Sequence, residues 1–298
     1  MKKTLCLFLT LVLVAAIFVG CGNIDGTEDL QESPVGDFEY ETNDENGITV
    51  LKYIGQSDTV VIPREIQNQP VTKIGDRAFE QTAVISVVIP DAVTVIGNEC
   101  FYRCERLESV ALSENLIQIG ASAFQECTQL KRITIPSATQ QIGDQAFNAS
   151  GLEEVIFEEG IERIGGYGCF SQTHIKKLVL PSTVKEIGLS AFAACPNLEI
   201  VELNEGLVEI GHKAFVSNPS LKEIVIPSTV RVVTEMDFNM CSGLKKVMFE
   251  GNAPNTFEYS DEVSGVWEPY DLDFTVYYHE GAEGFTSPEW YGYPTKTW

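Results

Sequence analysis

Ile142-Gly143-Asp144-Gln145-Ala146-Phe147 is the stretch that decides the fold, because variants of it recur eight times between Ile74 and Phe238. The Ile-Gly pair is kept in seven of the eight copies, and Val233-Thr234 replaces it in the last. A fixed period of this length is typical of a solenoid, in which each unit stacks only on its neighbours. The Phe of the motif recurs every 22 or 23 residues, at Phe79, Phe101, Phe124, Phe147, Phe170, Phe192, Phe215 and Phe238.

One repeat combines a short strand with a tight return. Ile133 and Ile135 alternate with polar residues, which predicts a strand with one buried face. Pro136 lacks the N–H that a sheet ladder needs, so it ends the strand. The Gly after Ile allows a backbone conformation that a side chain would resist, and the Ala-Phe segment fits a short helical turn with Phe pointing inward. One unit cannot bury its own Ile, Leu and Phe, so units must stack as rungs.

This pattern closely resembles the BspA-type leucine-rich repeat of bacterial surface and secreted proteins, from about Val60 to Phe249. The resemblance implies a β-rich α/β solenoid: a leucine-rich-repeat superhelix of about eight rungs with a parallel sheet and short helical turns. The one-residue insertion at Gly165-Gly166-Tyr167-Gly168 and the decayed last copy predict local irregularity within the same fold.

The two ends of the stack need other structures, because an open end exposes the core. Phe38, Tyr40 and Thr42 alternate before Asn46-Gly47, a strong hairpin signal, so we expect an N-terminal β-hairpin cap. Residues 256–298 abandon the repeat and contain all three Trp, so we expect an aromatic C-terminal cap. The expected parts are a signal peptide (1–20), a lipidated Cys with an acidic tether (21–36), the N-terminal cap (37–63), the solenoid (64–255) and the C-terminal cap (256–298).

The N-terminus predicts export. Lys2 and Lys3 precede an uncharged apolar run, Leu5 to Val19, which has the length of a signal-peptide core and is short for a membrane span. The run ends at Phe18-Val19-Gly20-Cys21, which resembles a bacterial lipobox, although Leu is more usual than Phe three residues before the Cys. The resemblance implies that lipid on Cys21 anchors the protein to the outer face of the bacterial cell membrane. The alternative is an ordinary secretory signal with a chance Cys.

The chain is strongly acidic, with a net charge of −23. Without residues 1–20 it keeps 18 basic and 43 acidic side chains, which gives −25. Such a charge argues against nucleic acid and anionic lipid as partners, so the lipid anchor is the only expected membrane contact. Solubility outside the cell explains the charge without any partner, and a basic or calcium-bridged partner is the alternative.

Six of the eight Cys lie in the repeats and occupy two positions. We interpret them as buried small apolar residues. A disulfide is possible only between Cys104 and Cys127, which stand on successive rungs. Cys100 and Cys104 have no matching Cys or His pair, so no zinc site is expected. Cys100 and Cys169 take the Ala place before Phe, and four stand three residues after Phe: Cys104, Cys127, Cys195 and Cys241.

The sequence contains no recognisable catalytic constellation. His174, His212 and His279 are scattered, and the His-Glu-x-x-His, Gly-x-Ser-x-Gly, phosphate-loop and EF-hand spacings are missing. We therefore expect no enzyme, no cofactor and no metal.

The outward side chains of the predicted strands form the candidate ligand surface. A continuous apolar column in solvent is typical of a contact surface for an extended protein partner. Two alternatives stay open: β-branched residues simply favour strands, or other parts of the chain cover the column. One outward column is mixed and polar: Ser86, Ser109, Arg132, Glu154, Lys177, Ile200, Glu223 and Lys246. The other is mostly apolar: Val88, Ala111, Thr134, Ile156, Val179, Glu202, Val225 and Met248.

These features predict a non-catalytic, surface-anchored binding protein for a protein ligand, and the family resemblance implies adhesion to host matrix or to other cells. A second hypothesis is an accessory or structural lipoprotein that binds a partner on its own cell envelope. The third is carbohydrate binding, with Trp267, Trp290 and Trp298 stacking on sugars. The alternative for these Trp is a plug on the last rung. The sequence does not determine the oligomeric state.

Overall fold

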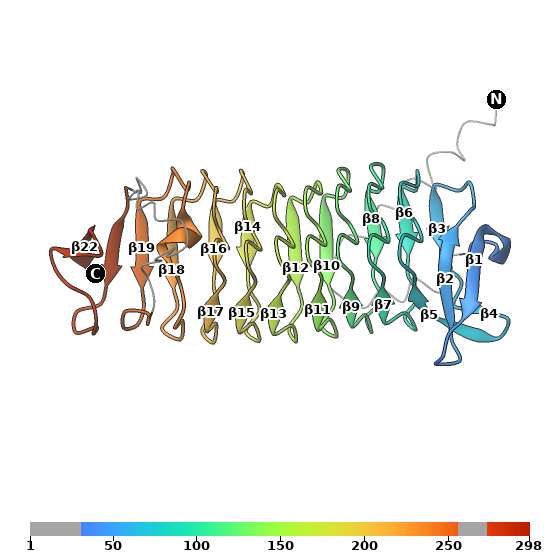
Figure 1. Cartoon of the computed structure of the whole chain (residues 1–298), viewed down its shortest axis with the longest axis horizontal. Coiled ribbons are helices and arrows are strands. Elements are labelled where there is room, and N and C mark those ends of the chain that lie inside the picture. The colour runs from blue at the N-terminus through green and yellow to red at the C-terminus, as the bar shows by residue number, and fades with distance from the viewer. Residues whose placement is uncertain (1–30, 256–272) are drawn as a thin grey trace, which may run out of the picture. The chain divides into compact units, whose positions relative to one another are not determined.

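The structure is a computed structural model that describes residues 31–255 and 273–298. The chain divides into two units, Met1–Glu32 and Ser33–Trp298, and the second contains all of the repeats. This second unit is a parallel-sheet solenoid of about ten turns (Figure 1). Most turns contribute a leading strand and, after a bend, a trailing strand. The predicted solenoid is confirmed, but it has more turns than the eight motif copies, because two strands beyond the last copy continue the stack.

The leading strands stack in parallel with one face inward. They are β3 (Thr59–Val61), β6 (Ser86–Val88), β8 (Ser109–Ala111), β10 (Arg132–Ile135), β12 (Glu154–Phe157), β14 (Lys177–Val179), β16 (Ile200–Glu202), β18 (Glu223–Ile226), β19 (Lys246–Phe249) and β20 (Thr275–Tyr278). The period-two prediction holds, since Ile133 pairs with Val155 and both are buried. Among the described strands the ladder is interrupted between β8 and β10, β12 and β14, and β16 and β18.

The trailing strands are shorter and form a second set of ladders. One ladder joins β5, β7, β9 and β11, and another joins β13, β15 and β17. The described trailing strands therefore separate between β11 and β13. The inserted residue of the fifth copy lies at this separation. The trailing strands are β5 (Gln69–Ile74), β7 (Val95–Ile96), β9 (Gln118–Ile119), β11 (Gln141–Ile142), β13 (Arg163–Ile164), β15 (Glu186–Ile187) and β17 (Glu209–Ile210).

The Ala-Phe segments are hydrogen-bonded turns. In the first copy, the N–H groups of Arg77, Phe79 and Gln81 all donate to carbonyls of the next rung, at 2.9, 2.8 and 2.8 Å. Arg77 and Gln81 reach this geometry with positive φ angles of 59° and 55°. These bonds alternate with bonds inside the turn, where Ala78, Glu80 and Thr82 donate to carbonyls three residues earlier, so the segment is a turn tied to the next rung and not the expected free-standing helical turn. In the decayed last copy the segment is instead a 3-10 helix, η3 (Glu235–Phe238).

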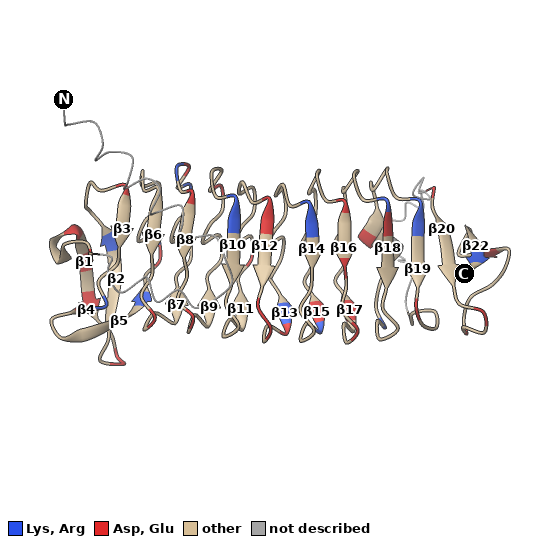
Figure 2. Ribbon diagram, turned by 180° about the vertical axis from the view of Figure 1, so that it is seen from behind, with Lys and Arg blue, Asp and Glu red and all other residues tan. Residues whose placement is uncertain are grey.

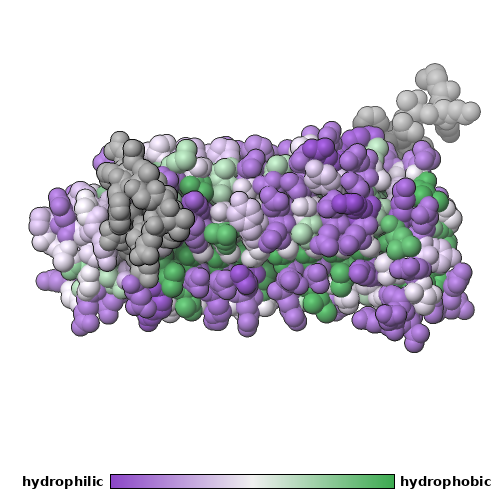
Figure 3. Space-filling view, in the orientation of Figure 1, coloured by the Kyte–Doolittle hydropathy of each residue, from purple (hydrophilic) through white to green (hydrophobic). Residues whose placement is uncertain are grey.

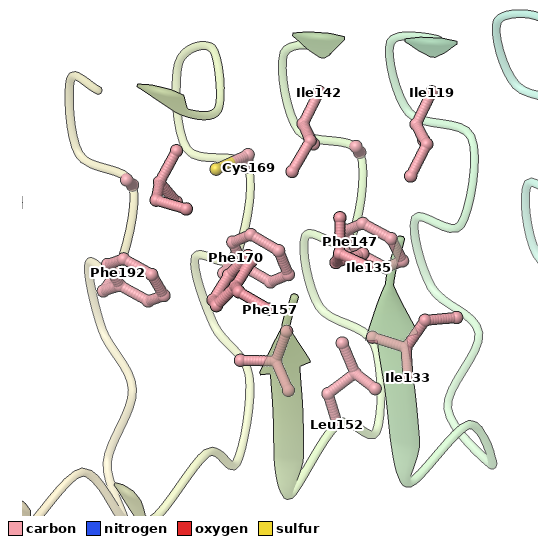
Figure 4. Close-up of a cluster of buried hydrophobic side chains, with 14 of the residues drawn as sticks. Ile119, Ile133, Ile135, Ile142, Phe147, Leu152, Phe157, Cys169, Phe170 and Phe192 are labelled. Atoms are coloured by element: carbon pink, nitrogen blue, oxygen red, sulfur yellow. The ribbon is translucent and has the colours of Figure 1, made fainter. Parts of the chain in front are cut away.

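Seven of the eight motif Phe side chains, from Phe79 to Phe215, form one continuous stack in the core, part of which Figure 4 shows. Ring centroids of neighbouring rungs lie 4.9 Å apart for Phe79 and Phe101 and 5.0 Å apart for Phe147 and Phe170, with nearly parallel planes. Figure 4 also shows Ile119 and Ile142 in a second row beside the rings. Because each ring packs on the next rung's ring, the stack joins the rungs through the middle of the molecule.

The Gly of the Ile-Gly pair is needed because neighbouring rungs pack closely there. From the sequence we instead expected this Gly to adopt a backbone conformation that a side chain would resist, and that reason is wrong. A Cβ on Gly120 would lie 2.5 Å from the carbonyl carbon of Gly97, and one on Gly143 would lie 2.5 Å from the amide nitrogen of Ala121. Neither glycine has a positive φ. The rungs approach so closely along this column that no side chain fits between them.

The N-terminal end is the expected antiparallel hairpin. It comprises β1 (Phe38–Thr42) and β2 (Ile48–Tyr53), with Asn46 at a φ of 56° in the turn. Strand β2 pairs in parallel with β5, and the Tyr53 ring stacks on Phe79 at 5.2 Å. These contacts support a capping role for the hairpin. The remaining N-terminal elements are the 3-10 helix η2 (Val35–Asp37) and β4 (Glu65–Ile66), which pairs with β5.

The C-terminal end contains strands β20, β21 (Glu289–Trp290) and β22 (Tyr293–Thr297). Strand β20 pairs in parallel with β19, and β22 pairs with both β20 and β21. Trp290 is buried here and packs against Phe249 and Phe285. The aromatic segment therefore supplies core side chains for the last turns, as a plug would.

Candidate ligand-binding surface

The apolar column lies on the leading strands in the register read from the sequence. Thr134 pairs with Ile156, Val179 pairs with Glu202, and Val225 pairs with Met248. At the N-terminal end, Val88 pairs with Ala111. The column consists of Val88, Ala111, Thr134, Ile156, Val179, Glu202, Val225 and Met248, and is called the strip below.

The described part of the chain leaves the strip at least partly open to solvent. Thr134, Val179 and Glu202 are exposed, and the other five side chains are half-buried. The exposed fraction of Val179 is 46%. Figure 2 shows the leading strands toward the viewer, and Figure 3 shows the opposite side of the molecule, where hydrophobic groups lie along the middle between hydrophilic edges.

Charged side chains accompany the strip and bind one another. Arg132 contacts Glu154 at 2.5 Å, and Lys246 contacts Glu223 at 3.0 Å, each between neighbouring leading strands. Figure 2 shows these basic and acidic residues at the same ends of adjacent strands. The polar column therefore alternates in sign, although the chain as a whole is strongly negative.

The strip is hollowed where the ladder between β12 and β14 is interrupted. This hollow has a volume of about 590 Å³, and Ile156 and Val179 line it together with Phe157 and Leu180. Phe157 stands where the preceding rung has Ile135, and its ring meets Phe170 edge-on at 5.6 Å. The sequence showed the unusual Phe157 but gave no means of recognising the interruption beside it.

The charged side chains at the rim of the hollow already have ion-pair or hydrogen-bond partners within the protein. Lys176 donates to Glu153 at 2.9 Å, and Lys177 contacts Glu202 at 2.7 Å. The hydrogen bond from Lys176 holds the pKa of Glu153 below its usual range. The backbone N–H and hydroxyl of Ser182 both donate to Glu159, which lowers the pKa of that carboxyl as well. A ligand of this hollow therefore meets apolar walls and charges that already have partners.

The six repeat Cys are buried free thiols, and Cys104 and Cys127 are not paired. The sulfur of Cys127 donates to the carbonyl of Phe101 at 3.1 Å, and that of Cys104 donates to Phe79 at 2.9 Å. Burial raises the pKa of Cys104 to about 11, so this thiol stays protonated at neutral pH. The position three residues after Phe therefore holds a hydrogen-bond donor, which the interpretation of these Cys as apolar residues missed. Thr82, Thr173 and Asn218 occupy the same position in other copies, and their polar side chains could have indicated it.

The structure describes only some of the remaining predicted site residues, which are Cys21 and the three Trp. Cys21 and Trp267 lie outside the described residues. Trp290 is 5% exposed and donates its indole N–H to the carbonyl of Gly284, so it offers no platform for a sugar. Trp298 is 45% exposed and stacks on His279 at 4.9 Å.

The described residues lack both a metal-binding cluster and a membrane-spanning helix. Residues 31–255 and 273–298 bring no three His, Cys, Asp or Glu side chains close enough to bind a metal ion. In the same ranges no helix has the length and apolar character needed to cross a membrane.

Comparison with known proteins identifies the repeat. A family model described as the BspA type leucine rich repeat region, with six copies, matches residues 72–177 and 166–261. No curated protein matches the chain.

Similar solved structures include three bacterial proteins. A leucine-rich repeat protein from Bacteroides ovatus is 24% identical, over 74% of this chain and 71% of that chain, with a TM-score of 0.49. A leucine-rich repeat protein from Bacteroides capillosus is 36% identical, over 42% of this chain and 97% of that chain, with a TM-score of 0.40. A leucine rich cell surface protein from Faecalibacterium prausnitzii is 21% identical, over 74% of this chain and 89% of that chain, with a TM-score of 0.45.

Proposed function

Because this chain belongs to the BspA-type leucine-rich repeat family, we propose that it is a non-catalytic binding protein whose leading strands hold a protein ligand. A solenoid builds an extended surface from the same position of successive repeats, which suits a long partner better than a small molecule. The apolar run before Cys21 supports export, with lipid on Cys21 anchoring the protein to the outer face of the bacterial cell membrane.

The hollow in the strip is the observation that carries the proposal. Ile156 and Val179 line it on adjacent rungs, and the charged groups around it are paired with one another. Apolar walls inside a polar rim are the arrangement of protein interfaces, where an anchoring side chain fills a pocket and the rim excludes water. We therefore place the anchor of the ligand between β12 and β14.

Paired substitutions test the role of the hollow. Ile156→Lys with Val179→Lys puts two charges on its walls, and we expect the affinity for the ligand to fall at least about tenfold. The chain without residues 1–21 is screened by surface plasmon resonance against matrix proteins, cells and envelope fractions of its own species. Val208→Lys is the matched control, because Val208 is 44% exposed and lies away from the strip.

The outcome also separates the two kinds of partner. Saturable binding to a matrix protein supports adhesion, whereas binding confined to the producer's own envelope supports an accessory role. Apolar anchoring predicts an affinity that changes little between low and high salt. Undiminished binding by the double Lys variant would show that the ligand does not use the hollow.

A further inference from the structure

A second concave site lies on the trailing strands, away from the strip. This groove has a volume of about 420 Å³, within the range of small-ligand sites. It follows β9 and β11 and extends across their separation from β13, since Arg163 of β13 also lines it. Its polar lining consists of Asn98, Gln118, Gln140, Gln141, Asp144 and Arg163, and it is called the amide groove below.

Within the part of the chain that the structure describes, three glutamine side chains of the amide groove have no hydrogen-bond partner. Gln118 and Gln141 are paired in the ladder of β9 and β11, so their side chains stand side by side. Gln140 precedes Gln141 and also lines the groove. Within the described residues their amides make no hydrogen bond or ion pair. Each amide offers one acceptor oxygen and two N–H donors, so neutral hydrogen-bonding groups converge on this groove.

The two charged groups that line the amide groove are each bound to another part of the chain. Asp144 accepts the backbone N–H of Tyr167 through Oδ1 at 2.8 Å, and Arg163 contacts Glu186 at 3.0 Å. One carboxylate and one guanidinium line the groove, so it carries no net charge in a chain of −23. An anionic ligand would also meet the repulsion of the whole chain. This balance favours an uncharged ligand that both donates and accepts hydrogen bonds.

An aromatic side chain continues the rim of the amide groove. Asn98 and Asp144 occupy the position after Gly on their rungs, and Tyr167 has this position on the next rung after Asp144 because of the insertion. Tyr167 is 51% exposed. It follows Gly166, which lines the groove, and its flat apolar ring is suited to one face of a sugar ring.

We propose that the amide groove binds a neutral oligosaccharide whose hydroxyl groups pair with Gln118, Gln140 and Gln141. Sugar hydroxyls donate and accept at once, as the amides do. Successive rungs, ~4.8 Å apart, repeat at close to the length of one pyranose ring, so the sugar chain runs along the solenoid axis. The glycine column beneath the groove is explained by rung packing, and the proposal does not depend on it.

Titration of the full-length protein with cellotetraose, maltotetraose and chitotetraose tests the proposal, with a heparin tetrasaccharide as the anionic comparison. By isothermal calorimetry we expect binding of at least one neutral probe, insensitive to salt. Gln118→Ala combined with Gln141→Ala should weaken it at least about tenfold, and Tyr167→Ala should weaken it as well. Gln129→Ala is the matched control, because Gln129 is an exposed Gln outside the groove.

Three results would overturn the assignment: no binding of any neutral probe, binding of the heparin fragment alone, or full affinity in the double Gln variant. Loss of sugar binding in Trp298→Ala with no effect of the Gln substitutions would place the site at the C-terminal end instead. The amide groove and the strip use different strands, so failure of one site leaves the other standing.

Discussion

At the residue scale, the position three residues after a motif Phe is a hydrogen-bond donor site facing a carbonyl in seven of the eight copies; in the fourth copy the buried hydroxyl of Ser150 has no partner among the described residues. Thiols bind the Phe carbonyl of the preceding rung, and the Thr hydroxyls bind the Phe carbonyl of their own rung. Asn218 donates to Phe192 and Phe215 together. The residues that donate in this way are Thr82, Cys104, Cys127, Thr173, Cys195, Asn218 and Cys241.

The isosteric pair Cys127→Thr and Cys127→Val tests this donor. Both side chains have the same branched shape, but only Thr keeps a donor for the buried carbonyl. We expect the Val variant to be less stable than the Thr variant by about 1 kcal/mol, the net value of one buried hydrogen bond. Urea unfolding of the two variants gives the difference. Equal stabilities would mean that the site selects only for size.

At the element scale, the insertion in the fifth rung is absorbed at a single residue. Gly166 donates to Ile142 as Gly143 donates to Ile119, so Gly165 is the extra residue. Gly165 has a φ of +73°, and a Cβ there would lie 1.9 Å from Cys169 Sγ. This bulge coincides with the separation of β11 from β13 and therefore forms the end of the amide groove.

Gly165→Ala should destabilise the protein by more than about 2 kcal/mol, because a left-handed backbone and a steric overlap act together. Gly281→Ala is the matched control. Its φ is +89° and nothing lies within 4 Å of the added Cβ, so only the backbone strain of about 1 kcal/mol applies.

Thermal and urea unfolding measure both variants of this pair. Adding Cys169→Ala to Gly165→Ala should recover part of the loss, since Ala is the usual residue at that place. The explanation fails if the two glycine variants lose equal stability.

At the scale of the whole molecule, stability rests on contacts between neighbouring rungs, and the C-terminal rungs carry a buried acid. Asp237 takes the Ala place of the last motif copy, and its Oδ2 accepts the backbone N–H of Thr234 at 2.7 Å. Burial raises the pKa of Asp237 from 3.8 to about 7. The folded state therefore binds this proton more tightly than the unfolded chain does.

Stability should fall as pH rises from about 4 to about 7, where the folded state must give up that proton. Repulsion among the excess acids acts in the same direction, so Asp237→Asn is needed to isolate the buried carboxyl. We expect Asp237→Asn to show a shallower decline. Amide hydrogen exchange, corrected for its own pH dependence, should show that the local unfolding that increases with pH occurs at η3 and at β18, β19 and β20. A decline of equal slope in both proteins would assign the effect to the net charge alone.

The sequence predicted the parts of the fold that depend on repetition. The Phe stack, the buried Ile of β10 and the register of the strip all follow from periods of two and of 22 or 23 residues. The hairpin at Asn46-Gly47 follows from turn chemistry. The sequence missed the bonds between turns and the reason for the Gly column, because both arise between residues 22 or 23 positions apart.

For the candidate sites, the sequence by itself determined which residues stand in each outward column, since alternation along a strand fixes the side on which a side chain lies. It also set the composition of the chain and the segment that precedes Cys21. Only the tertiary structure decided where those columns are hollowed. The ladders separate beside Phe157 and at Gly165, and both hollows depend on how neighbouring rungs pack, which no single repeat encodes.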